Sequence, residues 1–195
     1  MTTEYTSIEL CAGAGGQALG LHQAGFKHEL LIEIDKPACK TLEYNNLKHS
    51  LGWGKILEGC VQDFADNHAH KYSGIDLVAG GVPCPPFSKA GKQLGKDDER
   101  DLFPAALTIV EKTDPKAVLL ENVAGLLQPK FDEYRADIDK KLTRLGYETF
   151  WKLHNASDFG VPQLRPRVTL VALKPEYANF FSWPWSTIFR QVRGR

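Results

Sequence analysis

The chain alternates short apolar runs with helical patterns, and this alternation constrains its fold more than any other feature. The apolar runs that predict strands are residues 7–11, 29–34, 55–60, 76–79, 117–121, 149–153 and 167–173. Helical patterns cover residues 17–23, 102–111 and 134–145, and a further helix is expected after the second strand, where Asp35 can cap it. Such alternation predicts an α/β fold with a Rossmann-like, doubly wound and mostly parallel sheet. Because only a loop separates the last two strands, we expect them to form an antiparallel edge hairpin.

Length and composition are those of an ordinary globular domain. We expect residues 1–195 to form a single domain with a full core. Lys+Arg and Asp+Glu both number 24, and the net charge of zero argues against a large nucleic-acid-binding face without excluding a local one. No run approaches the roughly 20 apolar residues of a membrane span, and MTTEYTS lacks a secretory pattern. The cysteines are widely spaced without a C-x-x-C pair, so a cytoplasmic protein with reduced thiols and no metal site is expected.

A glycine-rich turn, AGAGG at residues 12–16, follows the first predicted strand. Glycines there permit a tight turn and the close approach of a ligand. Glu33 ends the second strand 20 residues after Gly13, where nucleotide-binding folds place a carboxylate for ribose hydroxyls, and Asp63 follows the third strand. These strand ends predict a site for a small adenosine-containing ligand. The alternative is that the glycines only turn the chain and the acids cap helices. The turn departs from G-x-G-x-x-G, which disfavours a dinucleotide.

Cys84 lies in GGVPCPPFSKAGK, directly after the fourth predicted strand. Ligands of open α/β sheets bind at this edge. Pro83 and Pro85 restrict the backbone on both sides, and a fixed placement lowers the entropic cost of bringing a nucleophile to its target. A buried packing role is the alternative for a free cysteine. It fits Cys39, on a predicted helix, better than Cys84.

Glu121 and two arginines are the remaining candidates. Four apolar residues precede Glu121, so we expect its carboxyl to be poorly hydrated and able to share a proton near neutrality; a helix-capping role is the alternative. Arg165 and Arg167 alternate across Pro166 where the last strand begins. Two guanidinium groups there suit a phosphate, a carboxylate or a polarised carbonyl. The alternative is that both arginines lie on a solvent-exposed edge and form only surface ion pairs.

Taken in order, the motifs ELCAGAGG, EID, PCPPFS, ENV and QLRPR resemble the cytosine-C5 DNA methyltransferase family. The resemblance extends from Ile8 to about Trp185. It implies the fold of S-adenosylmethionine-dependent methyltransferases and the transfer of a methyl group from that cofactor to C5 of a cytosine in double-stranded DNA. Bacterial restriction–modification is the best fit within the family.

The resemblance also implies a role for each catalytic candidate. Cys84 is the nucleophile that adds to C6 of the cytosine, and Glu121 binds the ring N3 and the exocyclic amine. Arg165 and Arg167 hold the base carbonyl, the thiol region or a nearby phosphate. Because C6 is inaccessible in a stacked duplex, the base has to be swung out. The loop at residues 87–101, which is rich in lysine and glycine, is expected to close over the DNA.

For the cofactor, the resemblance implies a pocket over the glycine turn. The turn residues implied are Cys11, Ala12, Gly13, Gly15 and Gly16. Glu33 is expected on the ribose, Ile34 against the adenine and Asp63 on the adenine amino group. Phe64, Pro83 and Leu102 are expected to line the pocket.

The sequence departs from the family in three places. Cys11 stands where an aromatic residue is common, and Pro85 replaces the usual glutamine after the nucleophile. Family members also continue beyond the arginine motif with a target-recognition region and a segment that completes the cofactor pocket. We therefore expect a catalytic half, C-terminally truncated and without a target-recognition domain. A second polypeptide that carries the missing parts is one alternative, and a truncated chain is the other.

Two other functions stay open from the sequence. One is a tRNA cytosine-C5 methyltransferase of the related type, because the motifs do not separate the two nucleic acids. The other is a non-catalytic remnant that binds the cofactor or a partner chain. An exposed apolar surface where the missing segment should pack would favour this second alternative.

Overall fold

A computed structural model describes residues 4–83 and 101–186. The chain consists of two compact units, Met1–Leu120 and Glu121–Arg195. The expectation of a single domain over residues 1–195 stays a prediction.

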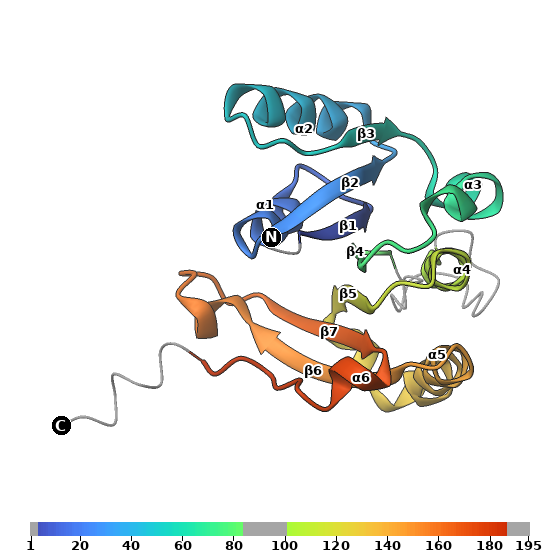
Figure 1. The fold of residues 1–195 in the computed structure, drawn as a ribbon. Helices are drawn as coiled ribbons and strands as arrows, with labels where there is room; N and C mark the ends of the chain where they lie inside the picture. The colour runs from blue at the N-terminus through green and yellow to red at the C-terminus, as the bar shows by residue number, and fades with distance from the viewer. Residues whose placement is uncertain (1–3, 84–100, 187–195) are drawn as a thin grey trace. The chain divides into compact units, whose positions relative to one another are not determined.

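Five parallel strands organise the first unit (Figure 1). They are β1 (Tyr5–Leu10), β2 (Phe26–Glu33), β3 (Lys55–Glu58), β4 (Leu77–Gly80) and β5 (Ala117–Val123), in the order β3-β2-β1-β4-β5. Leu10 is the register partner of both Ile32 and Gly80, and Gly80 is also the partner of Leu120. The strands therefore end in one row, and the segments that follow them start from the same edge of the sheet.

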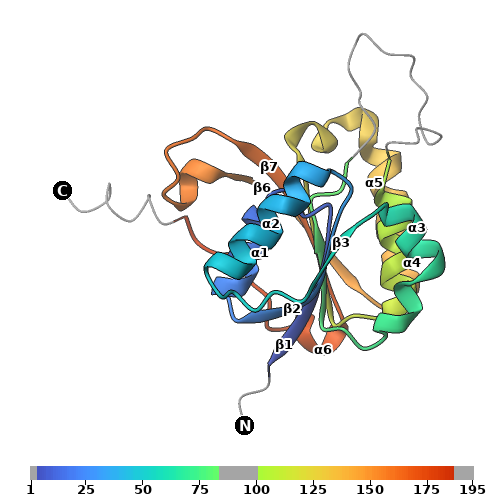
Figure 2. The same ribbon diagram turned by 90° about the horizontal axis from the view of Figure 1, so that it is seen from above.

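Helices cover both faces of these strands. They are α1 (Gly16–Gln23), α2 (Lys36–Lys48), α3 (Val61–Asn67) and α4 (Phe103–Thr113), with a 3-10 turn η1 (Ala69–Tyr72). Figure 2 shows α1 and α2 on one side of the strands and α3 and α4 on the other. Asp35 caps α2 as predicted, accepting a hydrogen bond from the Ala38 amide at 2.9 Å. The sequence did not predict α3, whose short length gives too few residues for a clear period.

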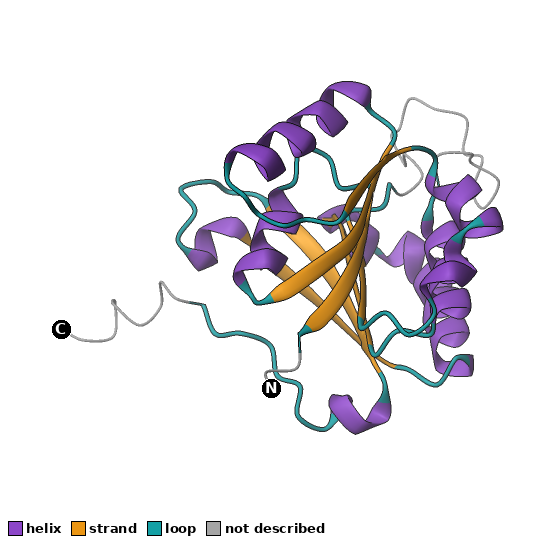
Figure 3. Ribbon diagram, turned by 45° about the horizontal axis from the view of Figure 1, so that its top comes forward, coloured by secondary structure: helices purple, strands orange, loops and turns teal. Residues whose placement is uncertain are grey.

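The core of the first unit follows from this two-sided cover. Ile8 and Leu10 of β1 are fully buried, and so are Ser7 and Glu9 on its other side. Facing α1 and α2, the apolar cluster consists of Ala12, Ala18, Leu31, Leu42 and Trp53. β1 departs from the continuous apolar run that is usual for a strand buried on both faces, because Ser7 and Glu9 alternate with its apolar residues. The strong twist of the strands is visible in Figure 3.

An antiparallel hairpin is the main feature of the second unit. It pairs β6 (Glu148–Asn155) with β7 (Pro166–Leu173), from Glu148 opposite Leu173 to Asn155 opposite Pro166. The helices and 3-10 turns are η3 (Ala124–Leu127), η4 (Pro129–Phe131), α5 (Asp132–Arg144), η5 (Ala156–Phe159) and α6 (Pro175–Ala178). The Trp151 indole of β6 donates to the Asp139 carboxylate of α5 at 2.8 Å. The predicted hairpin is confirmed, and so is the fold class, since the chain carries a seven-stranded mixed sheet with helices.

Candidate functional site

The glycine turn after β1 is built on left-handed backbone. Gly13 and Gly15 have φ of +56° and +93°, and Cys11 adopts +53° although it is not glycine. A Cβ on Gly15 would lie 2.8 Å from Leu42 Cδ2 and 3.1 Å from the Trp53 ring, which is closer than packed carbons allow. Glycine is therefore favoured at this position mainly by its φ, and a side chain there would also have to displace the end of the Leu42 side chain. By contrast, a Cβ on Gly13 would meet nothing within 4 Å, so this part of the turn is open.

Glu33 holds the turn from the end of β2. Its Oε2 accepts a hydrogen bond from the Gly13 amide at 2.7 Å, and its Oε1 accepts from the amides of Ile34 and Asp35, both at 2.8 Å. The side chain is nearly buried, and these three N–H groups replace the water that a carboxylate would otherwise bind. Glu33, the residue predicted to bind the ribose, thus lies at the turn that was expected to carry the cofactor.

Cys11 lies beside this carboxylate. Burial, followed by the negative charge of Glu33, raises the pKa of the Cys11 thiol to about 12. A neutral thiol is a poor nucleophile, so Cys11 is a wall residue of the turn rather than a reactive group.

Three further predicted cofactor residues lie after β2 and β3. Ile34 is 71% exposed, an unusual state for an isoleucine and one that suits a ligand contact. The Asp63 side chain lies along α3, where Oδ1 accepts from Asn67 at 2.8 Å and Oδ2 is 3.8 Å from His68. Phe64 is buried, with its ring centroid 5.6 Å from that of Tyr72. In this structure Phe64 is a core residue of α3, and its role in a cofactor pocket stays a prediction.

Pro83 and Leu102 meet at the end of β4. The Leu102 amide donates to the Pro83 carbonyl at 3.1 Å, and Asp101 accepts a hydrogen bond from the Phe103 amide at 3.1 Å at the start of α4. Gly80 precedes this contact, and a Cβ there would lie 2.5 Å from the Leu10 carbonyl oxygen. Two residues predicted for the same pocket, 19 positions apart in the sequence, are therefore joined directly.

Glu121 and Arg167 form an ion pair in the second unit. The Arg167 Nε lies 2.6 Å from Glu121 Oε1, and the side chains are 26% and 38% exposed respectively. Arg167 also donates to the Pro166 carbonyl at 2.9 Å. The structure thus joins two of the predicted catalytic residues from β5 and β7. The expectation of a poorly hydrated Glu121 carboxyl was wrong, because it is partly exposed and faces a guanidinium group.

Arg165 precedes β7 in a loop that starts at η5. Its side chain is exposed, and its carbonyl accepts from the Ala156 amide at 3.3 Å. Asn155 and Asp158 form a reciprocal capping box that shapes η5, and Gly160 ends it with a φ of +88°. No contact places Arg165 beside Glu121 within the described residues. Its predicted catalytic role therefore stays a prediction.

The predicted nucleophile, Cys84, and residues 87–100 of the predicted loop lie outside the described residues, and only Asp101, the last residue of that loop, is described. Their roles are not tested by the structure.

Glu9 is a buried acid that the sequence reasoning missed. It lies in β1, only 1% exposed, and the Ala18 amide of α1 hydrogen-bonds to it. Its Oε2 has no hydrogen-bond partner among the described residues. The signal was a single acid inside the apolar run SIEL, which predicts a buried carboxyl but not its partner.

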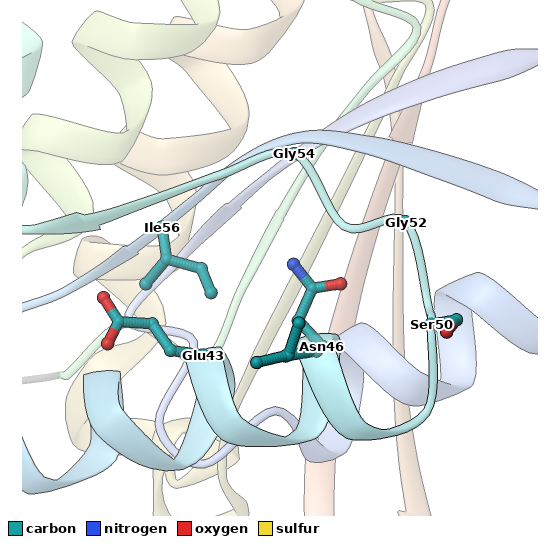
Figure 4. Close-up of a pocket in the computed structure, with 7 residues that line it drawn as sticks. Glu43, Asn46, Ser50, Gly52, Gly54 and Ile56 are labelled. Carbon is teal, nitrogen blue, oxygen red and sulfur yellow. The ribbon is translucent and has the colours of Figure 1, made fainter.

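Gly15 and Gly16 of the turn line one groove of the first unit, together with Trp53. A second groove is lined by α2 and by the segment that leads into β3, with Glu43, Asn46, Leu47, Ser50, Gly52, Gly54 and Ile56 around it (Figure 4). The Asn46 amide group is already used there, since it donates to the Trp53 carbonyl at 2.8 Å and accepts from the Trp53 amide at 2.9 Å. No predicted site residue lines this groove.

The donor and acceptor groups of the turn fit an adenosine-containing cofactor. An open glycine turn, a carboxylate at the end of β2 and an exposed apolar residue after it are what such a ligand requires. Within residues 4–83 and 101–186, no group of three His, Cys, Asp or Glu side chains could hold a metal ion. Over the same ranges, no helix is long and apolar enough to cross a membrane.

Comparison with known proteins gives one consistent result. The family described as C-5 cytosine-specific DNA methylase matches residues 5–191. Over 181 residues the chain is 60% identical to the type II methyltransferase M.NgoMIV of Neisseria gonorrhoeae, covering 93% of this chain and 55% of that protein. It is 51% identical over 180 residues to M.NaeI of Lentzea aerocolonigenes, covering 92% of this chain and 42% of that protein.

Solved structures agree with the sequence matches. A DNA modification methyltransferase encoded within an E. coli prophage has a TM-score of 0.69 at 26% identity, covering 92% of this chain and 49% of that one. DNMT2 of Spodoptera frugiperda, at 24% identity and a TM-score of 0.68, supports the fold. The chain spans about half the length of the curated relatives M.NgoMIV and M.NaeI. Since the match extends over nearly all of its residues, the chain belongs to the C-5 cytosine-specific DNA methylase family.

Proposed function

We propose that this chain is the catalytic part of a DNA cytosine-C5 methyltransferase of a bacterial type II restriction–modification system, acting in the cytoplasm. The observation that carries the proposal is the Glu121–Arg167 ion pair, with 2.6 Å between Arg167 Nε and Glu121 Oε1. It brings together two residues from motifs that are 46 positions apart in the sequence. In a chain of this family, that pairing supports a site that grips one polar edge of a base.

The proposed reaction assigns a separate task to each residue. Cys84, as the thiolate, adds to C6 of a flipped cytosine, and the new S–C6 bond makes C5 electron-rich. Glu121 binds N3 and the exocyclic amine and shares the proton at N3. Arg167 neutralises and orients Glu121, since its Nε–H donates to one carboxylate oxygen and leaves the other free for the base. After C5 has been methylated, loss of the C5 proton and release of Cys84 restore the aromatic ring.

S-adenosylmethionine is the proposed cofactor, and it supplies the methyl group. Glu33 would accept from the ribose hydroxyls while keeping the Gly13 amide in place, because each carboxylate oxygen has two lone pairs. Ile34 would pack against the adenine with its exposed side chain. Cys11, Pro83 and Leu102 would close the pocket, and Asp63 would have to turn from Asn67 to reach the adenine amino group.

Double-stranded DNA is the proposed substrate. The relatives M.NgoMIV and M.NaeI extend well beyond the matched region, and we propose that an equivalent region, in the same or a second polypeptide, supplies target recognition. The zero net charge of the chain fits this division, because the phosphate-binding surface need not lie on the catalytic part alone.

A methyl-transfer assay tests the proposal. The chain is mixed with the region of M.NgoMIV that lies beyond the match, and transfer from labelled cofactor is measured to duplex DNA and to tRNA. We expect transfer to DNA, reduced by about 100-fold or more in Glu121→Gln. Glu43→Gln, an exposed glutamate of α2, is the matched control and should leave the rate unchanged. Transfer to tRNA alone, or cofactor binding without transfer to either, would contradict the proposal.

A further inference from the structure

Arg135 of α5 makes several contacts for one side chain. Its Nη1 donates to the carbonyls of Leu126 and Gln128, the latter at 3.4 Å, and its Nη2 donates to the Asp132 carboxylate. Only 18% of the side chain is exposed. A planar guanidinium group suits this arrangement, because its fixed fork of donors can satisfy carbonyls and a carboxylate at once.

The carbonyls that Arg135 binds belong to the segment that directly follows the ENV motif. The turn η3 begins at Ala124, next to the last residue of β5 and three residues after Glu121. Leu126 is buried at 1% exposure and anchors the turn. Without Arg135, the Leu126 carbonyl would lose this donor, and a partly buried carbonyl without a partner is costly.

The same turn contacts the strand that carries the other half of the ion pair. η3 packs against β7, and β7 begins at Pro166, one residue before Arg167. The turn is therefore covalently joined to the strand of Glu121 and packed against the strand of Arg167. A shift of η3 would change the separation of the two side chains, which now meet at 2.6 Å.

We propose that Arg135 is a positioning residue for the Glu121–Arg167 pair: by holding η3 from the start of α5, it fixes the geometry of a site that it does not touch. That Arg135 affects catalysis rests on the proposed function, whereas its effect on the geometry of the Glu121–Arg167 pair does not. The exposed Asp132 carboxylate forms an ion pair with Arg135 Nη2 and so neutralises the guanidinium charge.

The structural part is tested by NMR on the chain labelled with ¹⁵N-arginine. The Arg167 Nε–H exchanges slowly with water when it is bonded to Glu121. In Arg135→Met we expect its exchange to accelerate by roughly fivefold or more, because the local opening that exposes it becomes easier. Arg135→Lys keeps the positive charge and part of the hydrogen bonding, so its Arg167 Nε–H exchange rate should lie between those of the wild type and Arg135→Met. Arg144→Met, at the exposed end of the same helix, should match the wild type.

The catalytic part is tested by covalent trapping with a 5-fluorocytosine duplex, in the presence of the complementary region of M.NgoMIV. Arg135→Met should slow trapping by about tenfold or more while the Kd of the cofactor changes less than twofold, as expected when a residue outside the proposed cofactor set misplaces a catalytic residue. Thermal unfolding checks that the variant is folded.

The outcomes separate the two proposals. Unchanged Arg167 exchange in a folded Arg135→Met protein overturns the positioning role, whether or not the enzyme is active. Faster exchange with an unchanged trapping rate overturns the catalytic part of the assignment, because trapping would then not depend on how firmly the pair is held. Faster exchange in a chain whose wild type never traps DNA supports the structural device and contradicts only the proposed function.

Discussion

Three glutamates, Glu9, Glu33 and Glu121, show how strongly the environment decides what a carboxyl group does. Glu33 accepts three backbone N–H groups and so holds a turn. Glu121 faces a guanidinium group at 2.6 Å and remains partly exposed. Glu9 is buried with one oxygen unpartnered among the described residues, and burial raises its pKa to about 8, although the Ala18 amide opposes the shift. At neutral pH Glu9 is therefore mostly protonated, unlike a carboxylate in water.

Glu9 makes stability depend on pH in a direction that can be worked out. Its pKa is about 8 in the folded chain and near 4.5 as a free group, so the folded state binds the proton more tightly. Its contribution is most favourable below pH 4.5 and is lost as pH rises to about 8. Glu9→Gln cannot titrate and so removes this loss. As pH rises through that window, the unfolding free energy of the variant should increase relative to the wild type by on the order of a few kcal/mol, since one pKa unit is about 1.4 kcal/mol.

Urea unfolding of both proteins at pH 5.5 and 8.5 measures this gain. If the two proteins show the same change in unfolding free energy between the two pH values, Glu9 does not titrate as stated.

At the scale of elements, the first unit depends on contacts that fasten strands at both ends. At the carboxyl ends, Glu33 and the Leu102–Pro83 hydrogen bond fix the turns. At the amino ends, Asp76 before β4 accepts from the Thr6 amide of β1 at 2.7 Å and lies 2.5 Å from Lys116 Nζ before β5. One carboxylate thereby joins three neighbouring strands.

Asp76 is expected to stabilise the unit only while it is ionised. Burial raises its pKa, but the Lys116 and Thr6 contacts outweigh burial and lower the pKa below 3.8. The stabilisation is present above pH 3.8 and is lost as pH falls through the lower folded value. At pH 7, Asp76→Asn should reduce the unfolding free energy by about 1–3 kcal/mol.

Denaturant unfolding from pH 7 down to pH 3 checks this prediction, with Glu43→Gln as the exposed control. The difference between Asp76→Asn and the wild type should shrink towards the acid end. A difference that stays constant would mean that the charge of Asp76 is not what stabilises the strands.

The sequence predicted these elements well because parallel strands buried on both faces are long apolar runs. All seven predicted strands are present, with ends that shift by a few residues, and Asp35 caps α2 as expected. The short α3 was missed, since Val61–Asn67 has too few residues to show a helical period. Side-chain partners were harder: the pairing of Glu121 with Arg167 depends on how β5 and β7 are placed, which no local pattern encodes.

At the scale of the molecule, the chain belongs to the C-5 cytosine-specific DNA methylase family and matches only part of its relatives' length. The match to the C-5 cytosine-specific DNA methylase family covers residues 5–191 of the chain, yet the chain spans only about half the length of M.NgoMIV and M.NaeI. The described residues hold a fitting cofactor turn in one unit and the Glu121–Arg167 pair in the other. In the proposed function, the Cys84 sulfur is the atom that bonds to the base.

Mass spectrometry of a trapped complex tests that requirement most directly. A 5-fluorocytosine duplex retains the enzyme because the C5 fluorine cannot leave as a proton does. With cofactor and the complementary region of M.NgoMIV present, we predict one DNA adduct, on the peptide that contains Cys84. The adduct should be lost in Cys84→Ser and unchanged in Cys60→Ser, an exposed thiol of the same chain. An adduct on another cysteine, or equal trapping by Cys84→Ser, would contradict the account.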